Sequence, residues 1–260
     1  MSKITMKDIL IKIDSLKKID KDIFLLCFES GYIAKNTQPG QFIHVNLLDN
    51  EVILRRPLSI HDIRGNKVYL LFRVRGKGTE VLANKQKGDL LKVLGPLGRG
   101  FSLPSQKTEN ILLAGGMGVA PFLFLVRKLI GCGNRNIHLI LGFKTKKDMI
   151  HIKELSKLKI GIDIVTEDGS LGCKGLVTDV LKKYLAKMDL PKNIYACGPK
   201  LMFKSIYKTI KNSKDVFCQV SFEEFMGCGI GVCKACALKG KDKDYYICKD
   251  GPVFDINDIF

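Results

Sequence analysis

The stretch LLAGGMGVAP, residues 112–121, decides the fold of the middle of this chain. It reads as the end of an apolar strand, a glycine-rich turn and the start of a helix that runs to about Ile130. Glycines in such a turn let a pyrophosphate approach the backbone, although the pattern GGxGxAP departs from the GxGxxG fingerprint. A tight turn that needs glycine only for packing is the alternative. The candidate nucleotide-binding residues are Gly115, Gly116, Gly118 and Pro121.

Strands and helices alternate on both sides of this stretch. Strands are expected at 111–113, 137–141, 162–165 and 193–196, and helices at 176–185 and 200–211. This alternation predicts a doubly wound parallel sheet, in which ligands bind outside the carboxyl ends of the strands. Asp168 follows one such strand end, and Cys197, Gly198 and Pro199 follow another. Cys197 could therefore lie beside a nicotinamide and act in catalysis, or it could equally be a core residue.

The first hundred residues read as short strands separated by turn formers. The expected strands are 9–13, 23–28, 42–45, 68–74 and 90–94, with a helix near 79–84. This pattern predicts a small antiparallel barrel, for which we expect six strands. We therefore expect a barrel domain at 1–104, an α/β nucleotide domain at 105–215 and a small C-terminal subdomain at 216–260.

Four of the nine cysteines cluster near the C-terminus. Cys228, Cys233 and Cys236 follow the spacing C-x4-C-x2-C and precede Cys248, as in plant-type ferredoxins that hold a [2Fe–2S] cluster. Glycines at 227, 229 and 231 let the backbone wrap closely and point N–H groups at sulfur, which tunes the reduction potential. A structural zinc site is the alternative, although zinc loops usually carry C-x2-C pairs on both sides.

Two segments of the barrel have the chemistry of a flavin site. In RRPLSI, residues 55–60, Arg56 offers a forked donor to a phosphate, Pro57 fixes the backbone beside a flat ring, and Ser59 can donate to flavin N5. In FRVRGKGT, residues 72–79, a strand enters a Gly-x-Gly-Thr turn and a helix, whose free N–H groups favour phosphate. A solvated arginine pair and an ordinary tight turn are the alternatives.

Composition and charge exclude some classes of protein. The net charge is +17, but the lysines are scattered and no nucleic-acid module accompanies them, so we expect no nucleic-acid binding. The N-terminus lacks the apolar block of a signal peptide, and no apolar stretch is long enough to span a bilayer comfortably. We therefore expect a cytoplasmic protein that does not enter the membrane.

Taken in order, the motifs RxxS, GxGT, GGxGxAP and CGP resemble the ferredoxin–NADP⁺ reductase superfamily over essentially the whole chain. Within it, the tail at 223–254 looks like the electron-transfer subunit of the two-subunit, NAD-linked dihydroorotate dehydrogenase family. RRPLSI and the segment GPLG at 95–98 match that family too.

The resemblance implies a route for electrons. A partner catalytic subunit oxidises dihydroorotate at its FMN in pyrimidine biosynthesis, and electrons pass through a [2Fe–2S] cluster to FAD and on to NAD⁺. It also implies two copies of each subunit. Residues implied to hold the flavin are Arg56, Pro57, Leu58, Ser59, Leu71, Phe72, Arg73, Val74, Gly78 and Thr79.

Two other functions stay open from the sequence. Lys144, Lys146 and Lys147 follow the second strand of the nucleotide domain, where lysines could favour a 2′-phosphate or form a solvated basic loop. An NADP(H)- or ferredoxin-linked diaphorase subunit of another redox complex is therefore the alternative. A zinc-binding interaction module would instead be colourless.

Overall fold

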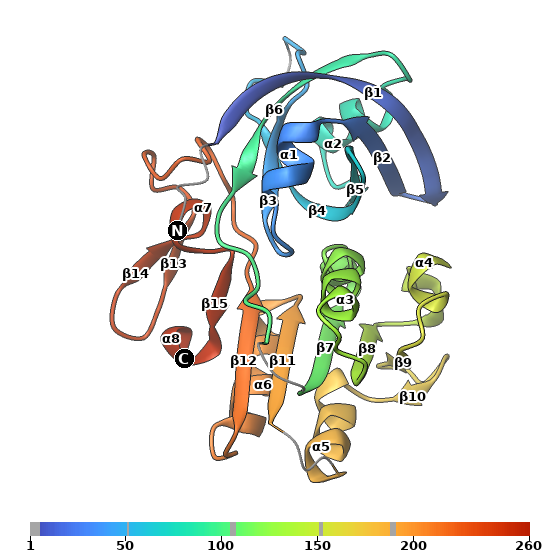
Figure 1. The fold of residues 1–260 in the computed structure, drawn as a ribbon, viewed down its shortest axis with the longest axis vertical. Coiled ribbons are helices and arrows are strands. Elements are labelled where there is room, and N and C mark those ends of the chain that lie inside the picture. The colour runs from blue at the N-terminus through green and yellow to red at the C-terminus, as the bar shows by residue number, and fades with distance from the viewer. Residues whose placement is uncertain (1–5, 51, 105–107, 151–152, 188–190) are drawn as a thin grey trace. The chain divides into compact units, whose positions relative to one another are not determined.

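The computed structural model describes residues 6–50, 52–104, 108–150, 153–187 and 191–260. The chain divides into two compact units (Figure 1). The first comprises residues 1–100, 223–238 and 245–252, and the second comprises residues 101–222, 239–244 and 253–260. The domain boundaries expected near residues 104 and 215 remain a prediction from the sequence. By contacts, the residues expected in the C-terminal subdomain divide between the two units.

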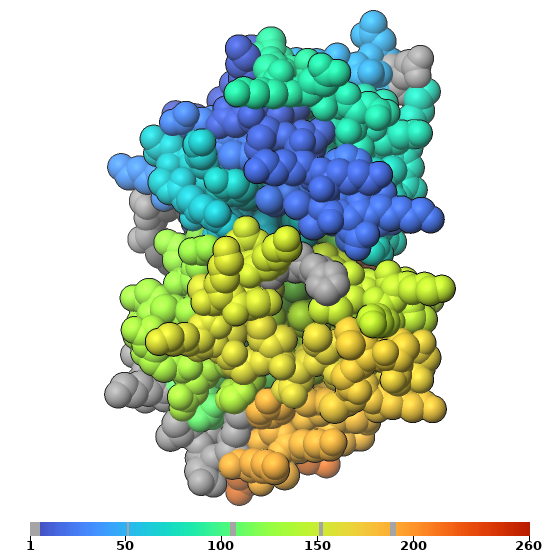
Figure 2. Space-filling model, turned by 90° about the vertical axis from the view of Figure 1, so that its right-hand side faces the viewer, coloured from blue at the N-terminus to red at the C-terminus, as the bar shows by residue number. Residues whose placement is uncertain are grey.

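The first unit contains a closed antiparallel barrel in the order β1-β2-β5-β4-β3-β6, which confirms the expected six-stranded barrel. Its strands are β1 (Lys7–Asp20), β2 (Ile23–Glu29), β3 (Phe42–Asn46), β4 (Arg56–Arg64), β5 (Lys67–Arg73) and β6 (Leu90–Leu97). Two short helices, α1 (Gly31–Asn36) and α2 (Lys77–Ala83), follow β2 and β5. In Figure 2, β1 and β2 (blue) form much of the visible surface of this unit.

Two barrel strands differ from the expectation. β4 contains RRPLSI from Arg56 onward, a segment that the sequence does not mark as a strand. Pro57 cannot donate to a ladder, so it weakens the strand signal there. β1 extends seven residues beyond Ile13 because, after a register shift at 13–15, its second half pairs with β2.

The second unit is built on a seven-stranded sheet in the order β10-β9-β8-β7-β11-β12-β15. The strands are β7 (Glu109–Gly115), β8 (Ile137–Phe143), β9 (Gly161–Thr166), β10 (Cys173–Lys174), β11 (Lys192–Cys197), β12 (Val216–Ser221) and β15 (Val253–Asp255). All pairs are parallel except β12 with β15. Strand order reverses between β7 and β11, so the carboxyl ends of these two strands form a switch point where ligands bind in such sheets.

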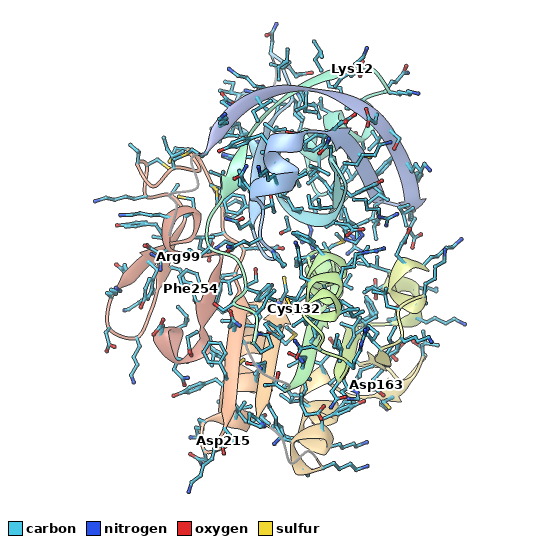
Figure 3. All side chains as sticks on the ribbon, viewed as in Figure 1. Lys12, Arg99, Cys132, Asp163, Asp215 and Phe254 are labelled. Atoms are coloured by element: carbon cyan, nitrogen blue, oxygen red, sulfur yellow. The ribbon has the colours of Figure 1, made fainter. Side chains whose placement is uncertain are left out.

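Helices connect the strands of this sheet, and a last helix, α8 (Ile256–Ile259), follows β15. The connecting helices are η1 (Gly116–Val119), α3 (Phe122–Gly131), η2 (Lys146–Asp148), α4 (Lys153–Ser156), α5 (Val177–Lys187) and α6 (Lys200–Ile210). α3 buries Phe122, Leu125 and Leu129, whereas α5 packs on α6 and on β7 and β8. Asp215, with a φ of 58°, occupies the turn that leads into β12 (Figure 3). No helix in the described part of the chain is both long and apolar enough to cross a membrane.

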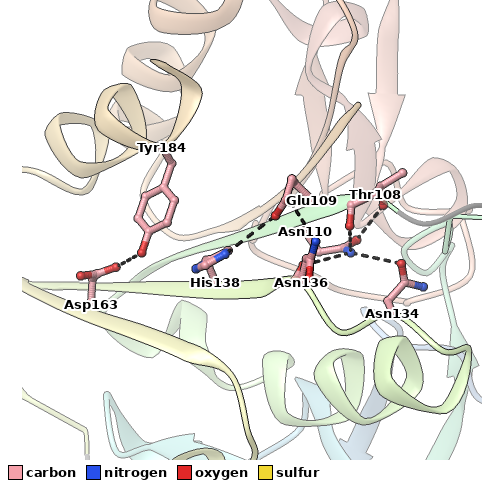
Figure 4. A network of polar contacts seen from close by, with 8 residues as sticks. All are labelled: Thr108, Glu109, Asn110, Asn134, Asn136, His138, Asp163 and Tyr184. Carbon is pink, nitrogen blue, oxygen red and sulfur yellow. Dashed lines mark hydrogen bonds and ion pairs between the residues drawn. The ribbon is translucent and has the colours of Figure 1, made fainter. Parts of the chain in front are cut away.

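A polar network lies at the amino ends of the parallel strands, at the opposite edge of the sheet from their carboxyl ends (Figure 4). Tyr184 on α5 donates to Asp163 on β9 at 2.5 Å, and its ring lies 4.7 Å from that of His138 on β8. His138 Nε2 is 3.8 Å from Glu109 Oε2. This network ties α5 to three neighbouring strands.

The tail contributes a third, small sheet of β13 (Ala237–Lys239) and β14 (Asp244–Tyr246), followed by α7 (Ile247–Asp250). We refer to residues 226–236 as the cluster loop. It groups with the barrel unit, and Cys248 on α7 belongs to the same unit.

Candidate functional site

Hydrogen bonds group the four clustered thiols into two pairs, Cys228 with Cys233 and Cys236 with Cys248. Cys228 Sγ accepts from the N–H groups of Ile230 and Cys233 at 3.4 Å, and Cys233 Sγ accepts from Cys228 N–H at 3.4 Å. Cys248 Sγ accepts from Gly231 N–H at 3.0 Å and lies 3.4 Å from Cys236 Sγ. Backbone donors that converge on sulfur suit an anionic thiolate group. The four thiols could therefore hold a [2Fe–2S] cluster.

The pKa values of these thiols reflect the same donors. Burial raises the pKa of Cys228, but hydrogen bonds from the Cys233 and Ile230 N–H groups outweigh it and lower that pKa to about 6. Burial and the hydrogen bond with Cys236 raise the pKa of Cys248 to about 12. The backbone donors around Cys228 thus stabilise its thiolate form over its thiol form.

Among the described residues, no group of three His, Cys, Asp or Glu side chains is arranged to hold a single metal ion. Cys236 and Cys248 are buried while Cys233 is exposed, so one edge of the cysteine cluster reaches the surface.

The two predicted flavin segments meet at one point of the barrel. The Arg56 guanidinium crosses the turn that opens α2, and a methyl group on Gly78 would fall inside its van der Waals contact. Arg56 Nη1 also donates to the Leu54 carbonyl at 2.6 Å. Thr79 Oγ1 accepts from Arg75 N–H at 2.9 Å and donates to the Gly76 carbonyl at 2.9 Å. A cation beside a fixed turn with backbone donors could bind the pyrophosphate of a flavin nucleotide.

The other predicted flavin residues differ in exposure. Ser59 is half-buried and lies opposite Phe42 in the β3–β4 ladder. Leu58, Leu71 and Phe72 are buried, and the Phe72 ring stacks on Phe24 with centroids 5.7 Å apart. Because Leu71 and Phe72 are consecutive on β5, their side chains lie on opposite faces of the barrel wall. Arg73 pairs with Asp22 at 3.2 Å, and Val74 N–H donates to the Asp22 carbonyl at 2.8 Å.

The predicted nucleotide segments meet at the switch point. A methyl group on Gly115 would come within 2.7 Å of Pro199 Cδ, and one on Gly118 would overlap the Cys197 carbonyl. Gly198, with a φ of 159°, packs against Gly115. Gly116 faces open space, and Pro121 caps the start of α3. Close packing therefore requires glycine at Gly115 and Gly118, and the role of these glycines in binding a nucleotide stays a prediction.

Cys197 and Asp168 differ in setting. Cys197 is 2% exposed at the end of β11. Asp168 is exposed, and hydrogen bonds from the Ser170 side chain and backbone, the former at 2.6 Å, hold its pKa below the usual range. Ser170 Oγ also accepts from Lys146 N–H at 2.8 Å, which links the β9 turn to the lysine loop after β8. The roles of both residues stay predictions.

Sequence reasoning missed His44, on β3. Its side chain is fully buried, and its pKa is lowered to about 4 by burial and by the charge of Arg55. A lone histidine in an apolar strand gives no sequence signal, because only the fold brings it to the cluster loop.

Comparisons with known proteins agree with this arrangement. Residues 223–260 match the family model of the iron–sulfur cluster binding domain of dihydroorotate dehydrogenase B, and residues 112–208 match the oxidoreductase NAD-binding domain. Among solved structures, a chain of an NADH-dependent reduced ferredoxin–NADP oxidoreductase is 29% identical, with a TM-score of 0.84 over 97% of this chain and 90% of its own. A ferredoxin–NADP⁺ reductase of Neisseria gonorrhoeae, 18% identical with a TM-score of 0.69 over 83% of this chain and 99% of its own, shares the fold.

Curated relatives cover nearly the whole chain. A protein of Desulforamulus reducens is 39% identical over 94% of both chains, and one of Fusobacterium nucleatum is 38% identical over 93% of this chain and 94% of its own. Both are named dihydroorotate dehydrogenase B (NAD(+)), electron transfer subunit. The chain therefore belongs to the family of electron transfer subunits of NAD-linked dihydroorotate dehydrogenase B.

Proposed function

We propose that this chain passes electrons from a dihydroorotate-oxidising catalytic subunit, which contains FMN, to NAD⁺ in pyrimidine synthesis. The observation that carries the proposal is that each of the four thiols accepts a backbone N–H, within a segment that matches the dihydroorotate dehydrogenase B cluster domain. The proposed complex holds two copies of each subunit and works in the cytoplasm.

The residues of this chain bind and orient three groups. Cys228, Cys233, Cys236 and Cys248 hold a [2Fe–2S] cluster, whose backbone donors set its potential. Arg56 and the Gly78–Thr79 turn hold the FAD pyrophosphate, and Ser59 donates toward the flavin ring. When bound, the flavin exchanges hydride with a nicotinamide and single electrons with a one-electron carrier such as the cluster.

The nucleotide occupies the switch point of the parallel sheet. Gly115, Gly116 and Gly118 leave the backbone open to the pyrophosphate, and Cys197, Gly198 and Pro199 border the nicotinamide. The lysines after β8 favour the alternative, an NADP(H)- or ferredoxin-linked diaphorase subunit. Rates of flavin reduction by NADH and by NADPH distinguish the two. We expect NADH to react faster, and a strong preference for NADPH would contradict the proposal.

Co-expression with a catalytic subunit tests the whole proposal. We expect the two proteins to co-purify and to form NADH and orotate together from dihydroorotate and NAD⁺. This chain alone should reduce dyes with NADH but should not oxidise dihydroorotate. Failure of the purified pair to couple orotate formation to NADH formation would sink the proposal.

A further inference from the structure

His44 lies in the barrel wall directly beneath the cluster loop. It sits on β3, opposite Pro57 of β4 and Leu94 of β6. Its side chain is 0% exposed, and neither Nδ1 nor Nε2 makes a hydrogen bond of good geometry with a described residue. A buried polar atom without a partner costs about 1–3 kcal/mol, so an apolar side chain would serve the barrel core better than this imidazole.

The ring contacts the loop at Gly229. A methyl group on Gly229 would come within 2.6 Å of His44 Nδ1, so the glycine backbone rests against the imidazole. Gly229 is buried and has a φ of 76°, a conformation in which a side chain is strained. The ring also interacts with the backbones of Cys228, in the loop, and of Arg55, which directly precedes β4.

The contacted segment carries a thiol that accepts two backbone hydrogen bonds. Cys228 Sγ accepts from Ile230 and Cys233 N–H, and Cys228 N–H donates to Cys233 Sγ. A displacement of the backbone at Gly229 that moves Cys228 with it would therefore disturb three of the sulfur hydrogen bonds at once. Such donors to sulfur set the potential of an iron–sulfur centre, and their loss typically lowers metal affinity by about 10–100-fold.

We propose that His44 is a positioning residue for the iron–sulfur centre, because its imidazole supports Gly229 and directs a ring N–H at the Cys228 backbone. The inference rests on the proposed function, since it requires a cluster on the four cysteines. Its action is indirect: the ring fixes the peptide, and the peptide fixes Cys228 and its donors.

Iron release to a ferrous-iron chelator and the electron paramagnetic resonance spectrum of the reduced protein test this role at pH 7. We expect His44→Leu to keep its FAD but to release iron at least tenfold faster, with an altered spectrum. His44→Gln keeps an N–H donor and should restore the release rate to within about threefold of the parent. Ile43→Val is the matched control, because Ile43 is equally buried on the same strand and the change only thins the barrel core.

Equal release rates and spectra for His44→Leu and the parent would overturn the inference, as would equal effects of Leu and Gln. A parent protein without iron would instead contradict the proposed function itself. If His44→Leu loses FAD, a double-mutant cycle decides instead. It compares the single variants Gly229→Ala and His44→Ala with the variant that carries both changes. If His44 supports Gly229 by contact, the double variant should release iron more slowly than the sum of the two single effects predicts. Additive effects on the release rate would refute the inference.

Discussion

Arg56 crosses the turn that opens α2, and Gly78 permits this close approach. A methyl group on Gly78 would displace the guanidinium, while one on Gly76 in the same turn would meet nothing within 4 Å. We therefore expect Gly78→Ala to weaken FAD binding by about tenfold or more, with little change in the stability of the barrel. The measurement is FAD dissociation followed by fluorescence.

Gly76→Ala is the control for this prediction, because Gly76 has an extended backbone with a φ of −179°. It should keep the FAD affinity of the parent. Equal loss of FAD from both variants would show that the turn itself matters rather than the position of Arg56.

Residue types with a chemical signature could be predicted from the sequence. The cysteine spacing and the glycine motifs identified their segments because the chemistry requires those residues at those distances. His44 could not be predicted, since its importance depends on which loop packs on β3. The close packing of Gly118 on the Cys197 carbonyl also became visible only in the fold.

At the scale of elements, η1 packs against the end of β11 beside the predicted nucleotide site. The Cys197 carbonyl that a methyl group on Gly118 would meet belongs to the backbone, which cannot move aside cheaply. We expect Gly118→Ala to destabilise the second unit by about 1–3 kcal/mol and to weaken NADH binding. Thermal unfolding and NADH titration measure the two effects.

Gly131→Ala provides the comparison for Gly118→Ala. Gly131 ends α3, and a methyl group added there would meet nothing within 4 Å. We expect the stability of this variant to equal or slightly exceed that of the parent. A Gly118→Ala protein as stable as Gly131→Ala would contradict the close packing on β11.

The Tyr184–Asp163 hydrogen bond ties α5 to β9 and gives a stability that depends on pH. Burial, and then Asp163, raise the pKa of Tyr184 to about 12. Because this lies above the ordinary value of 10, the stabilisation is complete below pH 10 and is lost as the pH rises through 12. We expect Tyr184→Phe to cost about 1 kcal/mol at pH 8, and less at pH 11.

Tyr207→Phe serves as the control for Tyr184→Phe. Tyr207 lies on α6, and its ring, which the change keeps, contacts the ring of Phe260. Thermal unfolding at both pH values should separate the two variants. A Tyr184→Phe deficit that is unchanged between pH 8 and pH 11 would argue against ionisation of this tyrosine as the cause.

Prediction of elements succeeded where periodicity is strong and failed where it is interrupted. The core strands of both sheets and the helices α5 and α6 follow from apolar patterns. β4 was missed because Pro57 interrupts the strand signal. β12 was missed because its last four residues are all buried and give no alternation, and β15 because three residues are too few for a pattern. The second half of β1 was missed because buried and exposed residues do not alternate there; its last four residues are all exposed.

At the scale of the whole molecule, we expect the exposed apolar side chains near Cys228 to face the proposed partner subunit. Phe225 is 90% exposed and Val232 is 72% exposed, on either side of Cys228. Exposed apolar groups beside a redox centre suit a protein interface. We expect Val232→Asp to weaken co-purification of the catalytic subunit at least tenfold, with FAD and iron contents unchanged.

Leu201→Asp is the matched control, because Leu201 is 77% exposed on α6 of the second unit. Pull-down of the co-expressed catalytic subunit compares the two variants. Full binding by Val232→Asp, or equal loss with Leu201→Asp, would exclude the cluster loop as the docking surface.

The central claim is that this chain holds a flavin and an iron–sulfur cluster together. An absorption spectrum of the anaerobically purified protein, with iron, zinc and flavin assays, tests it most directly. The account predicts FAD bands with a broad cluster shoulder and about two irons per chain. A colourless protein with one zinc per chain would contradict it and would make the cysteines structural.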